Sequence, residues 1–67
     1  MKLPKNDVVC NTITNTKEKV YVITRTLDGS YVLYKEVAKN DYEKISKKDS
    51  PLKLEKLIPD FNSEKRG

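Results

Sequence analysis

The sequence predicts a mostly β domain: a small antiparallel meander, either an SH3-like barrel or a three- to four-stranded sheet, with a short C-terminal helix or 3-10 element. Residues 19–27 and 30–38 are rich in β-branched and aromatic residues and flank Asp28-Gly29. An Asp-Gly pair between two such runs is a strong hairpin signal. The length of 67 residues indicates one domain spanning residues 1–67.

The first elements follow from side-chain type. Residues 1–6 form a polar lead-in that includes Pro4. Residues 7–14 contain five β-branched residues, which favours a strand. Residues 15–18 are polar and predict a four-residue loop into the next strand.

The central hairpin has an explicit predicted register. With Asp28 and Gly29 as the two turn residues, Leu27 pairs with Ser30, and the pairing continues to Val20 and Val37. Alternation then sorts the side chains onto two faces. One face carries Val20, Val22, Thr24, Tyr31, Leu33 and Val37. The other carries Tyr21, Ile23, Leu27, Val32 and Tyr34, with Arg25 and Glu36.

Both predicted faces are largely apolar, whereas a sheet with one solvated side shows one polar face. Either other segments, including residues 52–58, cover both sides, or one side binds a partner. The candidate partner-binding residues are those of the second face: Tyr21, Ile23, Arg25, Val32 and Tyr34.

Two readings are open after Ala38. Residues 42–46 can form a short strand, which we favour, or Asn40 and Glu43 can form a capping box that starts a helix. Residues 50–58 favour a helix, because Ser50 is a good N-cap and Pro51 suits the first position. The rival reading is a final strand that uses Leu52 and Leu54 and is broken at Lys56. Residues 54, 57, 58 and 61 have helical spacing, and Pro59 ends the element. The tail of residues 62–67 is predicted to be disordered.

Composition argues against catalysis and cofactor binding. The chain has one cysteine, Cys10, and no histidine, so an internal disulfide, a usual zinc site and a histidine-dependent triad are excluded. No phosphate-binding glycine loop is present. We therefore expect a non-enzyme without a cofactor or metal. Cys10 is expected to be a small buried hydrophobe.

The sequence also indicates a location and a source. No apolar run reaches membrane-spanning length, and no signal-peptide segment follows Met1. The unpaired thiol favours a reducing compartment. We expect a cytoplasmic protein, and the heavy use of Lys and Asn suggests a microbial or viral source.

Two functional hypotheses follow. The first is a small protein-interaction module, an accessory or inhibitor protein of a mobile element or phage, that binds another protein or a second copy of itself. The alternative is weak nucleic-acid binding, in which tyrosines of the sheet stack on bases and lysines contact phosphates. The net charge of +4 is a mild basic bias, and acidic residues are interspersed.

Overall fold

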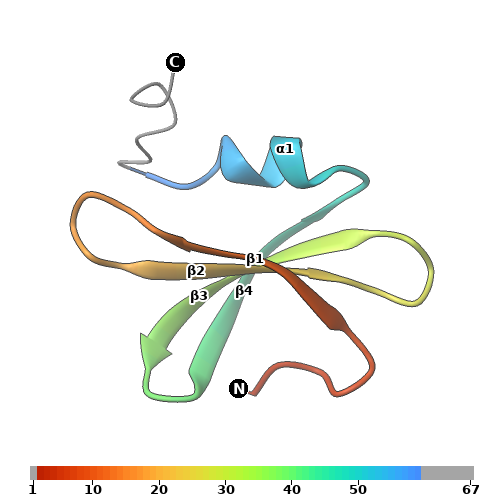
Figure 1. Cartoon of the computed structure of the whole chain (residues 1–67), viewed down its shortest axis with the longest axis horizontal. Coiled ribbons are helices and arrows are strands. Elements are labelled where there is room, and N and C mark those ends of the chain that lie inside the picture. The colour runs from red at the N-terminus through yellow and green to blue at the C-terminus, as the bar shows by residue number, and fades with distance from the viewer. Residues whose placement is uncertain (1, 60–67) are drawn as a thin grey trace.

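The computed structural model describes residues 2–59, which form one antiparallel sheet and one short helix (Figure 1). The strands are β1 (Val8–Thr14), β2 (Val20–Arg25), β3 (Tyr31–Ala38) and β4 (Asp41–Lys48), followed by α1 (Pro51–Glu55). The sheet order is β1-β2-β3-β4, a meander in which each strand pairs with its neighbour in sequence. The mostly β prediction is confirmed.

The sheet is open. In the described part of the chain β1 and β4 are its two edges, so the four-stranded meander is present and the closed SH3-like barrel is not. The favoured strand after Ala38 is confirmed as β4, and Asn40 occupies the preceding turn with φ 60° instead of capping a helix. Asparagine tolerates this left-handed conformation better than most residues, because its short polar side chain can bond locally.

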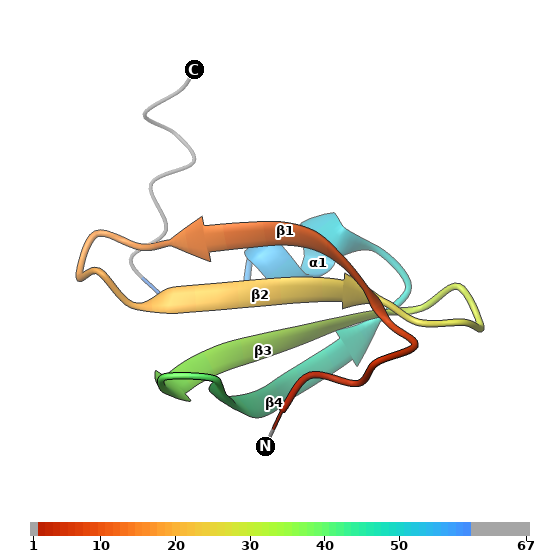
Figure 2. The same cartoon turned by 60° about the horizontal axis from the view of Figure 1, so that its bottom comes forward.

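The main core lies between one face of the sheet and α1, which crosses that face (Figures 1 and 2). The helix contributes Leu54, which is fully buried, and Ile58 follows just after it. Pro51 occupies the start of the helix and Ser50 its N-cap position, as predicted, but the Ser50 side chain makes no capping hydrogen bond. The packed cluster consists of Tyr21, Ile23, Leu33, Leu54 and Ile58, with Ile13 and Tyr31 partly buried against it.

The lead-in before β1, which in the structure comprises residues 2–7, passes over the other face of the sheet. In Figure 2 it runs from the start of β1 toward β4 on the side away from α1. The Thr24 hydroxyl donates a hydrogen bond to Asp7 Oδ2 at 3.3 Å, and Leu3 lines a hollow with Tyr42. The four buried side chains of this face are Val22, Thr24, Val32 and Tyr34. Both apolar faces of the hairpin are therefore covered.

The predicted register of the central hairpin is wrong by one residue. Arg25 pairs with Tyr31, and Ile23 pairs with Leu33. The loop has three residues instead of two, because the Thr26 N–H bonds to the Ser30 carbonyl at 2.8 Å. A shift of one residue moves every side chain of one strand to the opposite face. The β3 side chains therefore lie on the faces opposite to those predicted.

The reason for the shift is a single left-handed residue in the loop. The Gly29 N–H donates to the Thr26 carbonyl at 3.1 Å, and Gly29 has φ 86°. A two-residue type I′ turn would need positive φ at both Asp28 and Gly29. Three-residue loops instead place one residue, usually glycine, in the left-handed region.

The β1–β2 loop repeats this geometry without a glycine. Asn15 and Lys19 close a three-residue loop, and the Glu18 N–H donates to the Asn15 carbonyl at 3.0 Å. Glu18 takes the left-handed position with φ 63°. The loop is thus one residue shorter than the four residues predicted. Because a side chain with a Cβ is strained in this conformation, Glu18 destabilises the folded state relative to a glycine at the same position.

Exchanging the residue at the left-handed position should therefore change stability with opposite signs in the two loops. Glu18→Gly should raise the free energy of unfolding by about 1 kcal/mol, and Gly29→Ala should lower it by a similar amount. Space is not the cause at Gly29, since a Cβ there would meet nothing within 4 Å. Urea denaturation measures both changes. Glu18→Gln controls for charge, and a Glu18→Gly variant no more stable than Glu18→Gln would contradict the explanation.

Candidate protein-interaction surface

The five predicted partner-binding residues do not form one surface. Tyr21 and Ile23 lie in the core beneath α1, and Arg25 is an exposed residue of the same face at the end of β2. Val32 and Tyr34 lie on the opposite face. Four of the five are at most 4% exposed; only Arg25 is exposed. The prediction that these five residues share one face is wrong, because the predicted register was shifted by one residue.

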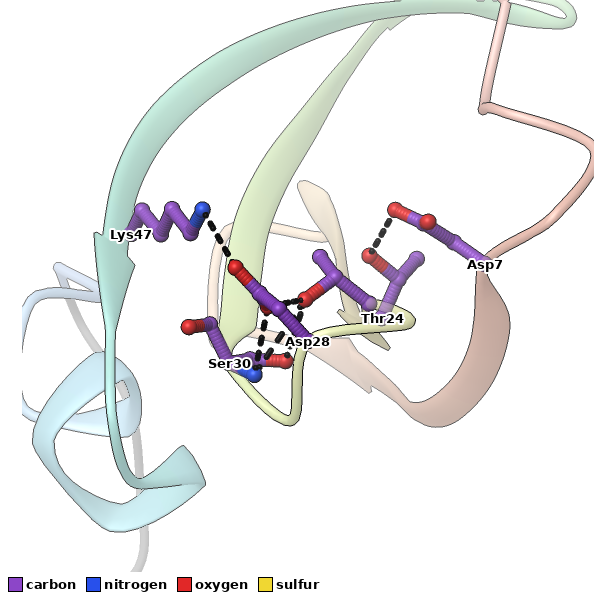
Figure 3. A network of polar contacts seen from close by, with 6 residues as sticks. Asp7, Thr24, Asp28, Ser30 and Lys47 are labelled. Atoms are coloured by element: carbon purple, nitrogen blue, oxygen red, sulfur yellow. Dashed lines mark hydrogen bonds and ion pairs between the residues drawn. The ribbon is translucent and has the colours of Figure 1, made fainter.

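A hydrogen bond joins the lead-in to the sheet face that carries Val32 and Tyr34 (Figure 3). Thr24, which is fully buried, bonds Asp7 there. Burial raises the pKa of the Tyr34 phenol, and the negative charge of Asp7 raises it further, against a smaller opposite effect of Thr24. This region is a packed layer of the fold and offers little accessible surface.

The tyrosines do not form an aromatic platform for nucleic acid. Tyr21 and Tyr34 are buried on opposite faces, and Tyr31 and Tyr42 are half-buried. Stacking on single-stranded bases needs exposed rings on one surface. The nucleic-acid hypothesis gains no support from this arrangement and stays a prediction.

The two edges of the sheet differ sharply in charge. Strand β4 has five charged residues among eight, including Lys44, Lys47 and Lys48, all exposed. Strand β1 has no charged residue in its sequence VVCNTIT, and six of its seven residues are exposed. Charged side chains protect sheet edges against pairing with another chain. By this criterion β4 is protected and β1 is not.

Exposed apolar side chains extend the β1 edge toward the β2–β3 loop. Val8 and Val9 are 64% and 51% exposed, and Leu27 at the loop is 83% exposed. Val8 and Leu27 line one shallow hollow of about 430 Å³, together with Asn6, Arg25, Thr26, Asp28 and Gly29. We call the outer edge of β1 together with Leu27 the β1-edge surface. Sequence reasoning missed it, although the absence of charge from residues 8–14 was its visible signal.

Hydrogen bonds hold the loop that presents Leu27 (Figure 3). The Thr26 hydroxyl donates to the Asp28 carboxylate, and the Ser30 N–H bonds the same carboxylate oxygen at 3.0 Å. Lys47 on β4 lies 3.4 Å from the other oxygen. These contacts, the Thr26 bond first, hold the pKa of Asp28 well below its usual range.

The Asp28 carboxylate should therefore stabilise the loop in a pH-dependent way. Because the folded pKa is depressed, its contribution is present above the unfolded pKa of about 4 and is lost as the pH falls toward the folded value. At neutral pH the wild type should melt at a higher temperature than Asp28→Asn, and the difference should shrink as the pH falls below about 4. In an NMR titration, Thr26→Val should raise the Asp28 pKa more than Lys47→Gln. The opposite order would contradict the assignment.

Cys10 does not occupy the buried position predicted for it. It lies at a β-bulge in β1, between the pairs Val9–Thr24 and Asn11–Ile23, and its side chain is exposed. A bulge residue is not paired across the strands, so it escapes the alternation that would bury it. Its Sγ lies 3.7 Å from the Val8 carbonyl.

The described residues contain no group of three or more His, Cys, Asp or Glu side chains placed to hold a metal ion. The helix within residues 2–59 does not have the length and apolar character needed to cross a membrane. No protein-family model, curated protein or solved structure matches this chain. The fold and its surface define a small open β-meander domain whose most distinctive exposed feature is an uncharged edge strand.

Proposed function

We propose that this chain is a small non-catalytic protein-interaction module that binds through the β1-edge surface. The observation that carries the proposal is the contrast between the edges: five charged residues in β4 and none in β1. An exposed strand edge offers backbone N–H and C=O groups to an added strand, and nearby apolar side chains add selectivity. Val8, Val9 and Leu27 supply such side chains.

The coverage of both sheet faces supports the same assignment. Because α1 and the lead-in already cover the apolar faces, binding there would require either layer to detach. The β1 edge needs no such rearrangement. The role as an accessory or inhibitor protein of a mobile element or phage belongs to this proposal, as does a cytoplasmic location.

Affinity capture with edge variants tests the proposal. Thr12 is exposed in the middle of β1, and Thr12→Pro replaces its N–H with a ring that obstructs strand addition. Thr12→Val keeps the N–H and the branched shape, so it is the matched control. The tagged wild type and Thr12→Val, expressed in the host together with an untagged copy, should retain the same protein, and Thr12→Pro should lose it.

Two results would overturn the proposal. One is that no protein, including the untagged copy, is enriched with the wild type. The other is equal enrichment by Thr12→Pro and Thr12→Val. Far-ultraviolet circular dichroism of each variant checks that the sheet has formed.

A further inference from the structure

We propose that the occupant of the β1 edge is a second copy of this chain, paired β1 to β1 in antiparallel orientation about a two-fold axis at Ile13. The inference rests on the proposed function and names its partner. The product is one continuous eight-stranded sheet, because each chain contributes the four strands of its meander.

The hydrogen-bond alternation of β1 shows which groups face outward. The Asn15 N–H bonds the Lys19 carbonyl at 3.0 Å, and the register runs without a shift from Thr14 to Asn11. In an antiparallel pair, hydrogen-bonded and non-bonded positions alternate. Ile13 and Asn11 therefore bond to β2, and Thr12 and Thr14 direct their N–H and C=O groups away from the sheet.

A two-fold axis at Ile13 would bring the outward groups of one chain opposite the outward groups of the other. With Ile13 opposite its symmetry mate, Thr12 of each chain lies opposite Thr14 of the other, so outward groups meet outward groups. This register uses the regular segment after the Cys10 bulge and leaves the bulge outside the central pairs. Ile13 already packs partly against the core cluster, so its contact with a second Ile13 would join the two cores.

Charge favours a second copy over other segments as the occupant. Pairing β1 with itself brings no charged strand residue to the interface, whereas pairing β4 with itself would bring the five charged residues of each strand there. The end of the chain, residues 60–67 with sequence DFNSEKRG, has four charged residues and low strand propensity. It is a poor candidate to fill the edge from within the chain.

The expected association is moderate and strengthens with salt. Standard stable interfaces bury about 800 Å² on each partner. That is about one sixth of the 4803 Å² accessible surface, more than one short strand edge provides, so we expect micromolar dissociation constants. Two chains of charge +4 repel each other, and salt screens that repulsion. Nucleic-acid binding would show the opposite salt dependence.

Sedimentation equilibrium of the purified full chain tests the dimer. The apparent mass of the wild type and Thr12→Val should rise with concentration, from 7.8 kDa toward twice that value, over about 1 to 200 µM. Thr12→Pro should stay monomeric. Thr12→Lys is a second disrupting variant, and Glu43→Gln on β4 adds the same unit of charge as its control. In NMR, the Thr12 and Thr14 amides should become protected from hydrogen exchange as concentration rises.

Three results would overturn the dimer, and capture from the host distinguishes its failure from that of the proposed function. A folded wild type that stays monomeric at about 200 µM and high salt overturns the dimer, and so does equal association by Thr12→Lys and Glu43→Gln. If capture from the host still depends on the Thr12 N–H, the proposed function survives and the partner is a different protein. Protection of Thr12 and Thr14 independent of concentration would show that the edge is filled within one chain, and would also overturn the dimer.

Discussion

Replacing Leu54 by alanine is expected to lower the free energy of unfolding by about 2–5 kcal/mol. Leu54 is the fully buried residue of α1 and packs in the core cluster with Ile23 and Leu33. A domain of this size has a total stability of about 3–10 kcal/mol, so this loss is a large fraction of the total. Urea denaturation followed by circular dichroism measures the loss.

The effect should be large because α1 cannot support itself. It has five residues, and isolated helices shorter than about 12 residues are marginal in water. Leu52→Ala is the matched control, because Leu52 lies on the same helix and is 66% exposed. Its expected change is within about 0.5 kcal/mol. Equal losses for Leu52→Ala and Leu54→Ala would contradict the packing of α1 described above.

Replacing Asn15 by alanine is expected to cost about 2–3 kcal/mol, because one buried side chain makes three hydrogen bonds. Asn15 Oδ1 accepts from the N–H groups of Lys17 at 3.0 Å and Lys19 at 2.9 Å. Its Nδ2 donates to the Pro59 carbonyl at 2.9 Å. The side chain, 7% exposed, thus closes the β1–β2 loop and attaches the segment after α1 to it.

Thr16→Ala in the same loop is the control for Asn15→Ala, since Thr16 is exposed, and its change should stay within about 0.5 kcal/mol. Hydrogen exchange should show faster exchange of the Lys17 and Lys19 amides in Asn15→Ala. Because Asn15 and Leu54 both hold the C-terminal segment on the sheet, the double variant should lose less than the sum of the single losses. Unchanged amide exchange at Lys19 would refute the role of Asn15.

The elements themselves were predictable from local sequence. β-Branched and aromatic runs marked β1, β2 and β3, and the Ser50-Pro51 pair followed by spaced leucines marked α1. Only the tertiary arrangement decides that Leu57 of this pattern remains 45% exposed. The predicted helical position of Phe61 and the tail at 62–67 lie outside the described residues.

The candidate site was less predictable, because it depended on a register accurate to one residue. An Asp-Gly pair is compatible with a two-residue loop and with a three-residue loop that begins one residue earlier. The Thr26 hydroxyl, the Ser30 N–H and the Asp28 carboxylate form the network present in the longer loop. The shift of register by one residue places Val32 and Tyr34 on the face opposite to that of Tyr21, Ile23 and Arg25.

The sequence by itself determined the kind, order and approximate limits of the strands and the helix, because these depend on neighbours along the chain. It also determined that both faces of the hairpin are apolar. Only the tertiary structure decided which side chains share a face, what covers each face and which edge remains open. The physical reason is that register, the packing of α1 and the contact of Asp7 with Thr24 join residues far apart in sequence.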